Sequence, residues 1–412
     1  MRRSLSSTVA GLVCLLLGPL CGAAQPGPTS VEAHLSFISE TVGVAAGGLE
    51  RGVVYHDNLN ATVTVHADSL VDWTGLTAHV YGLGNQGDPL STLVGDAQAT
   101  SNIEAPLAWR IYEAWLQQTL GTRASVLVGL YDLNAEFDVN RTGSLFLHSS
   151  HGIGAAFGLS GRNGPSIFPV TSMAVRARLR VVRRGYVQAA VLDGVPGCPA
   201  NPSGTVIRFR EGNGVLAATE IGVYLGGDSP ARAAVVDRTV DVDTPVKLAI
   251  GGWTYTTSLP EWPAVNTSGG IERSGGSTGV YALAEGRLVR EPGTEDQGLS
   301  AFGRVGWAND RHNRFSQYLG AGVVYTGLVP GRGADRVGLA VATAINGNAY
   351  EAAQRRVGRP VTEEEVGVEA TYAAPVTSWL TLVGDLQYVV NPNTDPTIPD
   401  ALVGGLRVVV EP

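Results

Sequence analysis

Apolar and polar residues alternate strictly along a short segment near the middle of the chain, Met-Ala-Val-Arg-Ala-Arg-Leu-Arg-Val-Val. In an extended strand successive side chains point to opposite faces, so Val175 and Leu179 share one face with other apolar residues. The opposite face carries Arg176, Arg178 and Arg180. A strand with lipid on one side and a water-filled lumen on the other accommodates both faces. We therefore predict that this segment crosses a membrane as part of a β-barrel.

The same two-residue period returns elsewhere in the chain, with polar side chains on the second face. The repeats cover residues 60–66, 186–192, 299–307, 366–372 and 380–388. In several of them the apolar set ends in Tyr or Trp, the residues that gather at lipid headgroups. We expect an all-β fold, a transmembrane antiparallel up-and-down β-barrel. Its predicted outer wall includes Val175, Leu179, Val187, Leu380, Leu382 and Tyr388.

The first residues have the order of a secretory signal peptide. A basic start precedes an apolar run and a group of small residues that ends at Ala24. The apolar run is too short to span a bilayer as a helix. We expect residues 1–24 to be a signal peptide and residues 25–412 to form one barrel domain. At roughly 24 residues per strand and connection, that length supports about 16 strands. The role of the segment directly after the signal is left open.

Composition argues against several other classes of protein. The net charge of −8 argues against a nucleic-acid partner. Cys198 is the only cysteine after the signal, which excludes an internal disulfide and a cysteine-based metal site. His148 and His151 have the spacing of ligands on one helical turn, but no third ligand lies nearby in the sequence. We expect no metal, no cofactor and no nucleic acid.

A glycine-rich segment, residues 82–87, matches the pattern of a dinucleotide-binding loop. Asp88 and Pro89 follow where the helix of such a site would run. We therefore predict a hairpin turn here instead of a nucleotide site.

The densest group of polar residues follows a strand-like stretch and precedes the arginine-bearing segment. Asp132, Glu136 and Asp138 bring carboxylates, and Asn134 brings an amide. A loop folded into a barrel lumen would set these acids across from the arginines of residues 176–180. Sugar hydroxyls both donate to carboxylates and accept from guanidiniums, so the pattern indicates a constriction that binds sugars. An ordinary solvated surface loop is the alternative.

Several segments spread over the chain carry the motifs of a known family. The most specific is Asp-Leu-Asn-Ala-Glu-Phe-Asp within residues 128–140. The others are residues 112–115, 147–153, 164–169, 279–285 and 384–392. Together they resemble the carbohydrate-selective porins of the OprB family, over essentially the whole chain after the signal.

The resemblance implies a barrel of about 16 strands in the bacterial outer membrane that admits glucose and other sugars by diffusion. In that family charged residues, arginines among them, and aromatic residues line a narrow constriction. Carried over where motif and facing agree, the expected sugar-binding residues are Glu113, Trp115, Asp132, Asn134, Glu136, Asp138, Arg176 and Arg178. One departure is that such barrels usually end in an aromatic residue, whereas this chain ends Val-Val-Val-Glu-Pro.

We therefore expect a channel for mono- and small oligosaccharides, held in outer-membrane lipid, with no catalysis. Two alternatives stay open from the residues alone. One is a general diffusion porin that sorts solutes by size and charge. The other is a secreted all-β carbohydrate-active enzyme, with two of Asp132, Glu136 and Asp138 as acid and base. Whether the barrel works alone or as a homotrimer is also open.

Overall fold

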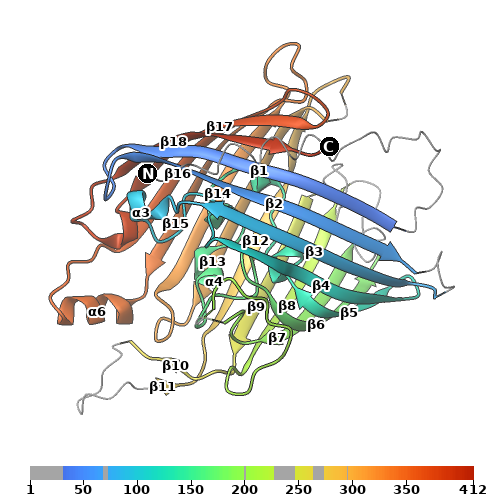
Figure 1. Ribbon diagram of the computed structural model, residues 1–412, viewed down its shortest axis with the longest axis horizontal. Helices are drawn as coiled ribbons and strands as arrows, with labels where there is room; N and C mark the ends of the chain where they lie inside the picture. The colour runs from blue at the N-terminus through green and yellow to red at the C-terminus, as the bar shows by residue number, and fades with distance from the viewer. Residues whose placement is uncertain (1–30, 68–72, 199–200, 227–245, 263–272, 295) are drawn as a thin grey trace, which may run out of the picture.

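Sixteen strands close into a barrel within the residues that the computed structural model describes. These residues are 31–67, 73–198, 201–226, 246–262, 273–294 and 296–412. Figure 1 shows the barrel from the side, with its strands inclined to one another. The closed antiparallel barrel confirms the predicted fold class. The predicted signal peptide, residues 1–24, lies outside the described residues.

Each barrel strand pairs with antiparallel neighbours in chain order, apart from β9, which pairs directly with β12. The barrel strands are β1 (Val31–Ala46), β2 (Gly52–His66), β3 (Leu76–Gly87), β4 (Ala108–Leu120), β5 (Ala124–Tyr131), β6 (Ser172–Val182), β7 (Gly185–Asp193), β8 (Val215–Leu225), β9 (Val246–Tyr255), β12 (Thr278–Arg290), β13 (Gly298–Ala308), β14 (Phe315–Thr326), β15 (Arg336–Asn346), β16 (Glu364–Pro375), β17 (Leu380–Val390) and β18 (Ala401–Val410). A separate small sheet pairs β10 (Leu259–Pro260) with β11 (Arg273–Ser274).

Short helices lie in the connections. They are α3 (Ser91–Val94), η1 (Leu133–Ala135), η2 (Thr142–Leu145), η3 (Ser149–His151), α4 (Ala155–Gly158), α6 (Asn348–Arg356) and η4 (Pro392–Thr394). Among the helices of the described residues, none is long and apolar enough to cross a membrane.

The first and last strands close the barrel. β1 pairs with β18 from Phe37 opposite Val410 to Val44 opposite Val403. Closure leaves no unpaired strand edge facing lipid. From Val31 onward, the segment that the sequence left unassigned is therefore the first barrel strand.

The two ends of the barrel differ in the length of their connections. One end carries long connections, among them residues 88–107, 132–171 and 347–363, and we call it the long-loop end. The other end carries tight turns such as residues 121–123 and 183–184, and we call it the short-turn end. Barrels of the outer membrane have short turns on the periplasmic side and longer loops outside the cell.

Exposure alternates along the strands as the residue pattern predicts. On β6, Val175 is 44% exposed and Leu179 is 46% exposed, whereas Arg176 between them is 1% exposed. Tyr388 on β17 is 44% exposed on the same outer face. Val187, Leu380 and Leu382 also lie on the outer face, at positions that alternate with inward side chains. The apolar faces therefore point outward and the arginine face points inward.

The inward arginines are not simply solvated, however. Arg178 is only 7% exposed, its guanidinium lies over the ring of Tyr186 at 4.1 Å from the ring centroid, and it donates to Gln188. The inner wall beside β6 is thus filled by packed side chains. An inward position in this barrel does not guarantee contact with lumen water.

A pair of aspartate substitutions tests the assignment of faces. Leu179→Asp is expected to impair membrane insertion, because a charge on the lipid face costs about 2–4 kcal/mol for Arg or Lys at the bilayer midplane, less toward the interfaces, and somewhat less for Asp. Thr62→Asp is the matched control, since Thr62 faces inward on β2 and is partly exposed. Insertion is measured from the amount of protein in the membrane fraction that shifts its gel migration on boiling. Equal insertion of the two variants would contradict the assignment.

Residues 82–87 do not form the predicted hairpin turn. They complete β3, where Gly84 lies opposite Trp109 of β4. A Cβ atom at Gly84 would stand 2.7 Å from the Trp109 ring, which is closer than real contacts allow. The glycine at this position therefore permits the indole to pack flat on the neighbouring strand.

Candidate functional site

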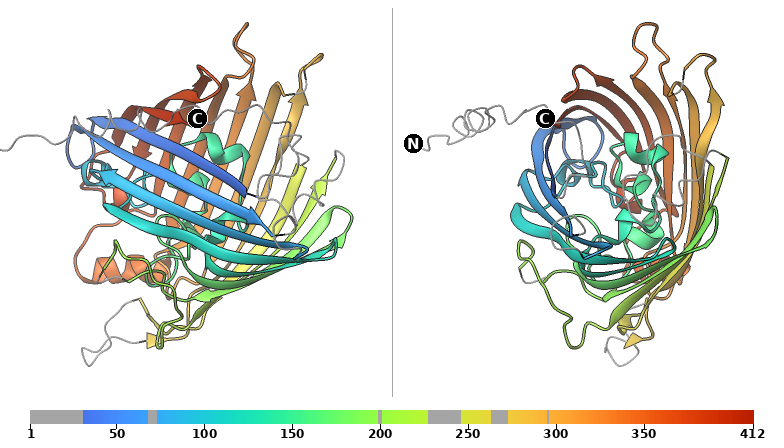
Figure 2. Two further views of the ribbon diagram at one scale, coloured as in Figure 1. Left: turned by 45° about the vertical axis from the view of Figure 1, so that its right-hand side comes forward. Right: turned by 90° about the vertical axis from the view of Figure 1, so that its right-hand side faces the viewer.

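The connection between β5 and β6, residues 132–171, folds into the barrel, and we call it the inner loop. Figure 2 shows its helical turns inside the ring of strands, and they pack against β13 and β14. Its buried aromatic residues fix it there. Phe157 stacks on Trp253 of β9 with 4.3 Å between ring centroids, and Phe146 packs near Phe302 of β13. The polar cluster of the sequence thus lies inside the barrel and is not a surface loop.

Glutamates of the wall hold the backbone of the inner loop. Each is 3% exposed or less and accepts N–H groups from the loop. Glu113 of β4 accepts from Asp132 at 2.8 Å, Glu220 of β8 from Asp138 at 2.9 Å, Glu285 of β12 from Thr142 at 2.8 Å, and Glu369 of β16 from Leu147 at 2.5 Å and His148 at 3.1 Å. Hydrogen bonds to a charged acceptor are stronger than neutral ones, so these contacts fix the path of the loop.

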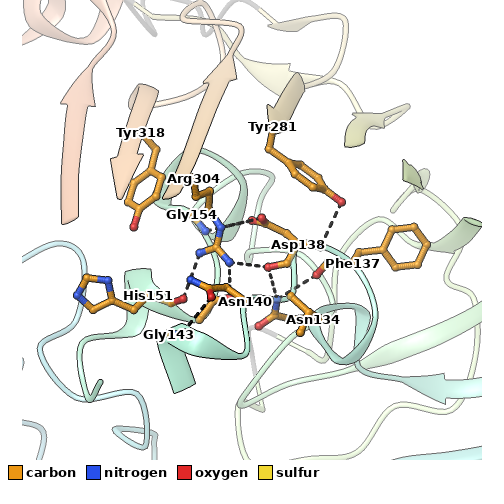
Figure 3. Close-up of polar contacts among 12 residues, drawn as sticks. Asn134, Phe137, Asp138, Asn140, Gly143, His151, Gly154, Tyr281, Arg304 and Tyr318 are labelled. Carbon is orange, nitrogen blue, oxygen red and sulfur yellow. Dashed lines mark hydrogen bonds and ion pairs between the residues drawn. The ribbon is translucent and has the colours of Figure 1, made fainter. Parts of the chain in front are cut away.

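Arg304 of β13 is the main contact between the wall and the inner loop (Figure 3). Its Nε lies 2.8 Å from Oδ1 of Asp138. Its remaining N–H groups donate to carbonyl oxygens of the loop, at Asp138, Ser150, His151 and Gly152. Tyr318 of β14 donates to the Ser150 carbonyl as well, at 2.6 Å. One buried guanidinium therefore ties together two distant turns of the loop.

Asp138 occupies a fully buried position with left-handed backbone, φ 55°. Its second carboxylate oxygen accepts the Gly154 N–H at 3.2 Å. Burial raises the pKa of the Asp138 carboxyl to about 6, while the Arg304 guanidinium and the Gly154 N–H oppose that rise. The carboxylate therefore depends on Arg304 to remain charged at neutral pH.

Glu136 and Arg176 form a two-pronged ion pair. The Arg176 Nε donates to Glu136 Oε2 at 2.7 Å and its Nη2 donates to Oε1 at 2.9 Å. The guanidinium also donates to Gln117 and Ser125, at 2.6 Å each. From the sequence we expected the loop acids to lie across a constriction from the β6 arginines. That arrangement is wrong, because Glu136 and Arg176 are in direct contact. Asp138 does not face the β6 arginines either, since its partner is Arg304.

The other predicted residues lie on β4 and in the first turn of the inner loop. Trp115 of β4 is buried, stacks on His79 with 4.8 Å between ring centroids, and donates its indole N–H to Glu113. The Asp132 side chain accepts the Asn134 N–H at 2.8 Å and caps η1. The Asn134 amide donates to the Phe137 carbonyl at 3.1 Å. Asp132 and Asn134 keep partial exposure, so they combine a turn-forming role with access to the lumen.

His148 and His151 lie side by side in the inner loop, with 5.5 Å between their ring centroids. Burial lowers the pKa of His148 to about 4 and, with the charges of His148 and Arg304, lowers the pKa of His151 well below its usual value. Both rings are therefore neutral at pH 7 and belong to the packing of the loop. Within the described ranges, no group of three or more His, Cys, Asp or Glu side chains could hold a metal ion.

A second connection, residues 88–107, covers the inner wall at the long-loop end. Ala97 and Gln98 donate their N–H groups to Glu365 of β16, at 2.8 and 2.9 Å. Ser101 contacts His56 of β2 at 3.0 Å. Arg407 of β18 contacts Asn102 of this connection and donates to Glu40 of β1 at 2.6 Å. Both connections therefore use buried charges of the wall as anchors.

Several of these anchors are not among the residues predicted from the sequence. Strand periodicity already placed Arg304 on an inner face, and it can do the same for Glu220 and Glu369 once their strands are recognised. Periodicity does not identify the partner of each charged residue, because the contacts join residues far apart in the chain. Glu40, His56 and Arg407 share that difficulty.

A closed barrel with an apolar outer wall and a charged loop folded into its lumen defines a porin-type channel. Residues 50–411 match the family profile described as carbohydrate-selective porin, OprB family. The chain belongs to this family. It is therefore an outer-membrane channel selective for carbohydrates and not an enzyme, which excludes the secreted enzyme considered above.

Individual relatives agree with the family. Porin B of Pseudomonas aeruginosa is 23% identical over 422 residues, which cover 92% of this chain and 87% of the relative. The high-pH structure of Pseudomonas putida OprB is 18% identical and matches with a TM-score of 0.78, covering 93% of this chain and 94% of that one. The low-pH structure of Pseudomonas putida OprB is 16% identical and matches with a TM-score of 0.57, covering 93% and 92% of the two chains. At these identities the solved structures show the shared fold.

Proposed function

We propose that this channel passes glucose, other monosaccharides and small oligosaccharides by passive diffusion. The family supports a sugar channel, and the inner loop supports selection inside it. The observation that carries the proposal is the buried anchoring of that loop by Arg304 and the wall glutamates, which holds the loop in a fixed position inside the barrel. Conduction requires binding that is favourable enough to enter and weak enough to leave.

Within the predicted sugar-binding set, we propose two different roles. Asp132 and Asn134 keep partial exposure and are proposed to contact the passing sugar. The other six members have buried side chains and are proposed to hold those two in place; they are Glu113, Trp115, Glu136, Asp138, Arg176 and Arg178. A buried side chain with its donors already engaged has little left to offer a solute.

Flux into liposomes tests the proposal. Liposomes carrying the protein are expected to admit D-glucose faster than gluconate and faster than tri(ethylene glycol), an uncharged solute without a sugar ring. Glucose block of the single-channel current is expected at roughly millimolar concentrations, as suits weak reversible binding. Equal rates for the two uncharged solutes would favour a general diffusion porin instead.

We also propose that barrels associate as a homotrimer through the wall between β8 and β14. This wall carries a hollow of about 830 Å³ lined mainly by apolar and small residues, including Ala282, Gly303 and Ala321. Small residues let neighbouring structures approach closely. Native mass spectrometry in lipid nanodiscs is expected to give a trimer that Gly303→Trp disrupts. A monomer mass for the unsubstituted protein would contradict this.

We also propose that the chain is divided into a signal peptide, residues 1–24, which is removed on export, and a barrel formed by residues 25–412. The basic start, short apolar run and small residues of the first segment support it. The N-terminal sequence of the protein purified from membranes tests it.

A further inference from the structure

Three charged side chains on the inner-loop side of the lumen are withdrawn from solvent. Arg176 is 1% exposed, Arg304 is 2% exposed and Asp138 is fully buried. Each of them is engaged by an ion pair or by loop carbonyl groups, and Lys247 likewise donates to the Val139 carbonyl. These groups shape the lumen, but a passing solute does not reach their charged atoms.

The opposite part of the inner wall, on β1 to β3, has a different character. Its inward side chains include the apolar Ile38 on β1 and, at the short-turn end, Glu32, which lies opposite Thr64 and contacts His66 at 3.4 Å. Six others are partly exposed hydroxyls, amides or imidazole; they are Ser36, Asn60, Thr62, Thr64, His79 and Tyr81. We call them the neutral strip. Their facing follows from β2, where Val63 is 44% exposed on the outer face between Thr62 and Thr64.

On β2 the neutral strip begins at Asn60, just beyond the inward residues that the second connection, residues 88–107, covers. His56 and Asn58, the preceding inward residues of β2, are buried, and Ser101 of that connection lies against His56. From Asn60 toward the short-turn end the inward residues of β2 are partly exposed. His79 adjoins Trp115, whose indole contacts Glu113, the acceptor for the Asp132 N–H. The strip therefore starts beside the first turn of the inner loop.

Hydrogen bonds link the members of the strip across the strands. The Tyr81 hydroxyl donates to the Asn60 side-chain oxygen Oδ1 at 2.7 Å, and the Asn60 Nδ2 donates to the Ser36 hydroxyl at 3.0 Å. Thr64 and His79 contact each other at 2.9 Å. Amides and hydroxyls can each donate and accept, as sugar hydroxyls can. A sugar can therefore exchange water for these groups one hydroxyl at a time.

We propose that the neutral strip is the surface along which uncharged sugars pass, and that Asn60 and Tyr81 determine their selection. This inference rests on the proposed sugar transport and places the contacts opposite the charged side. Neutral groups lose less on desolvation than charges do, so contacts with them stay weak and reversible. Repeated weak contacts are what a conducting pathway needs.

Removing single polar groups from the strip tests the proposal. Tyr81→Phe and Asn60→Leu are expected to raise the half-blocking concentration of D-glucose by about 2- to 10-fold each, the worth of one net hydrogen bond. Ion conductance and reversal potential are expected to stay unchanged, because no charge is removed. Tyr325→Phe is the matched control, since the Tyr325 hydroxyl lies on the outer side of β14 and donates to Glu291.

A second variant locates the pathway without any sugar. Asn60→Asp adds a negative charge in the same shape and is expected to shift the reversal potential in a salt gradient toward cations. An unmoved reversal potential, or glucose block unchanged in the Asn60→Leu/Tyr81→Phe double variant, would overturn the inference alone. Absence of glucose block in the unsubstituted channel would overturn the proposed function and this inference with it.

Discussion

Arg304→Met is expected to release the inner loop from β13 and to widen the channel. The substitution keeps an unbranched apolar chain in place of the aliphatic part of the arginine but removes the ion pair to Asp138 and the donors to the loop carbonyls. Breaking a buried pair by removing one partner costs about 3–5 kcal/mol, because the other charge stays buried and unpaired. Single-channel recordings are expected to show higher conductance and weaker glucose block.

The control and the rescue separate this effect from a general loss of charge. Arg355→Met removes an exposed pair with Glu351 on α6, where an exposed i,i+4 pair contributes only about 0.3–0.5 kcal/mol, and conductance should not change. The double variant Arg304→Met/Asp138→Asn is expected to regain stability, since no charge is stranded, while the loop stays loose. Conductance of Arg304→Met equal to that of the parent would show that the loop is held by its other anchors.

Neutralising the two partners of the Glu136–Arg176 pair is expected to shift ion preference in opposite directions. Arg176→Gln leaves the Glu136 carboxylate uncompensated and should favour cations. Glu136→Gln leaves the Arg176 guanidinium uncompensated and should favour anions. Each single variant is also expected to lose about 3–5 kcal/mol of stability, because Arg176 is 1% exposed.

The double variant Glu136→Gln/Arg176→Gln completes the double-mutant cycle for this pair. With both charges gone, the reversal potential in a salt gradient should return close to that of the parent. The two amides can still hydrogen-bond at the same place, so little change in conductance is expected. Reversal potentials that follow only one of the two residues would show that its partner is screened from the pathway.

Much of the architecture could be predicted from the residues because side-chain alternation in a strand is local. Val175 and Leu179 point outward and Arg176 points inward whichever strands lie beside β6. The contacts that build the site are not local. The Arg304 donor and the Asp138 carbonyl it reaches are 166 residues apart in the chain, and no spacing rule connects them. Gly84 is a further example: the glycine makes room for Trp109 of the next strand and does not form the turn that the sequence predicted.

The order of the residues is enough to predict the class of fold and the two faces of the wall. Lipid lies on one side of each strand and water on the other, so alternate side chains are apolar and polar, and this alternation is visible in the sequence. Which acid pairs with which base follows from the tertiary structure, because the path of the inner loop depends on the closed barrel around it. Closure of the barrel brings Arg304 to Asp138 and Arg176 to Glu136. These four charged groups therefore pair with one another and hold the loop in place. A strip of partly exposed neutral side chains on β1 to β3 stays accessible, as do Asp132 and Asn134 of the loop.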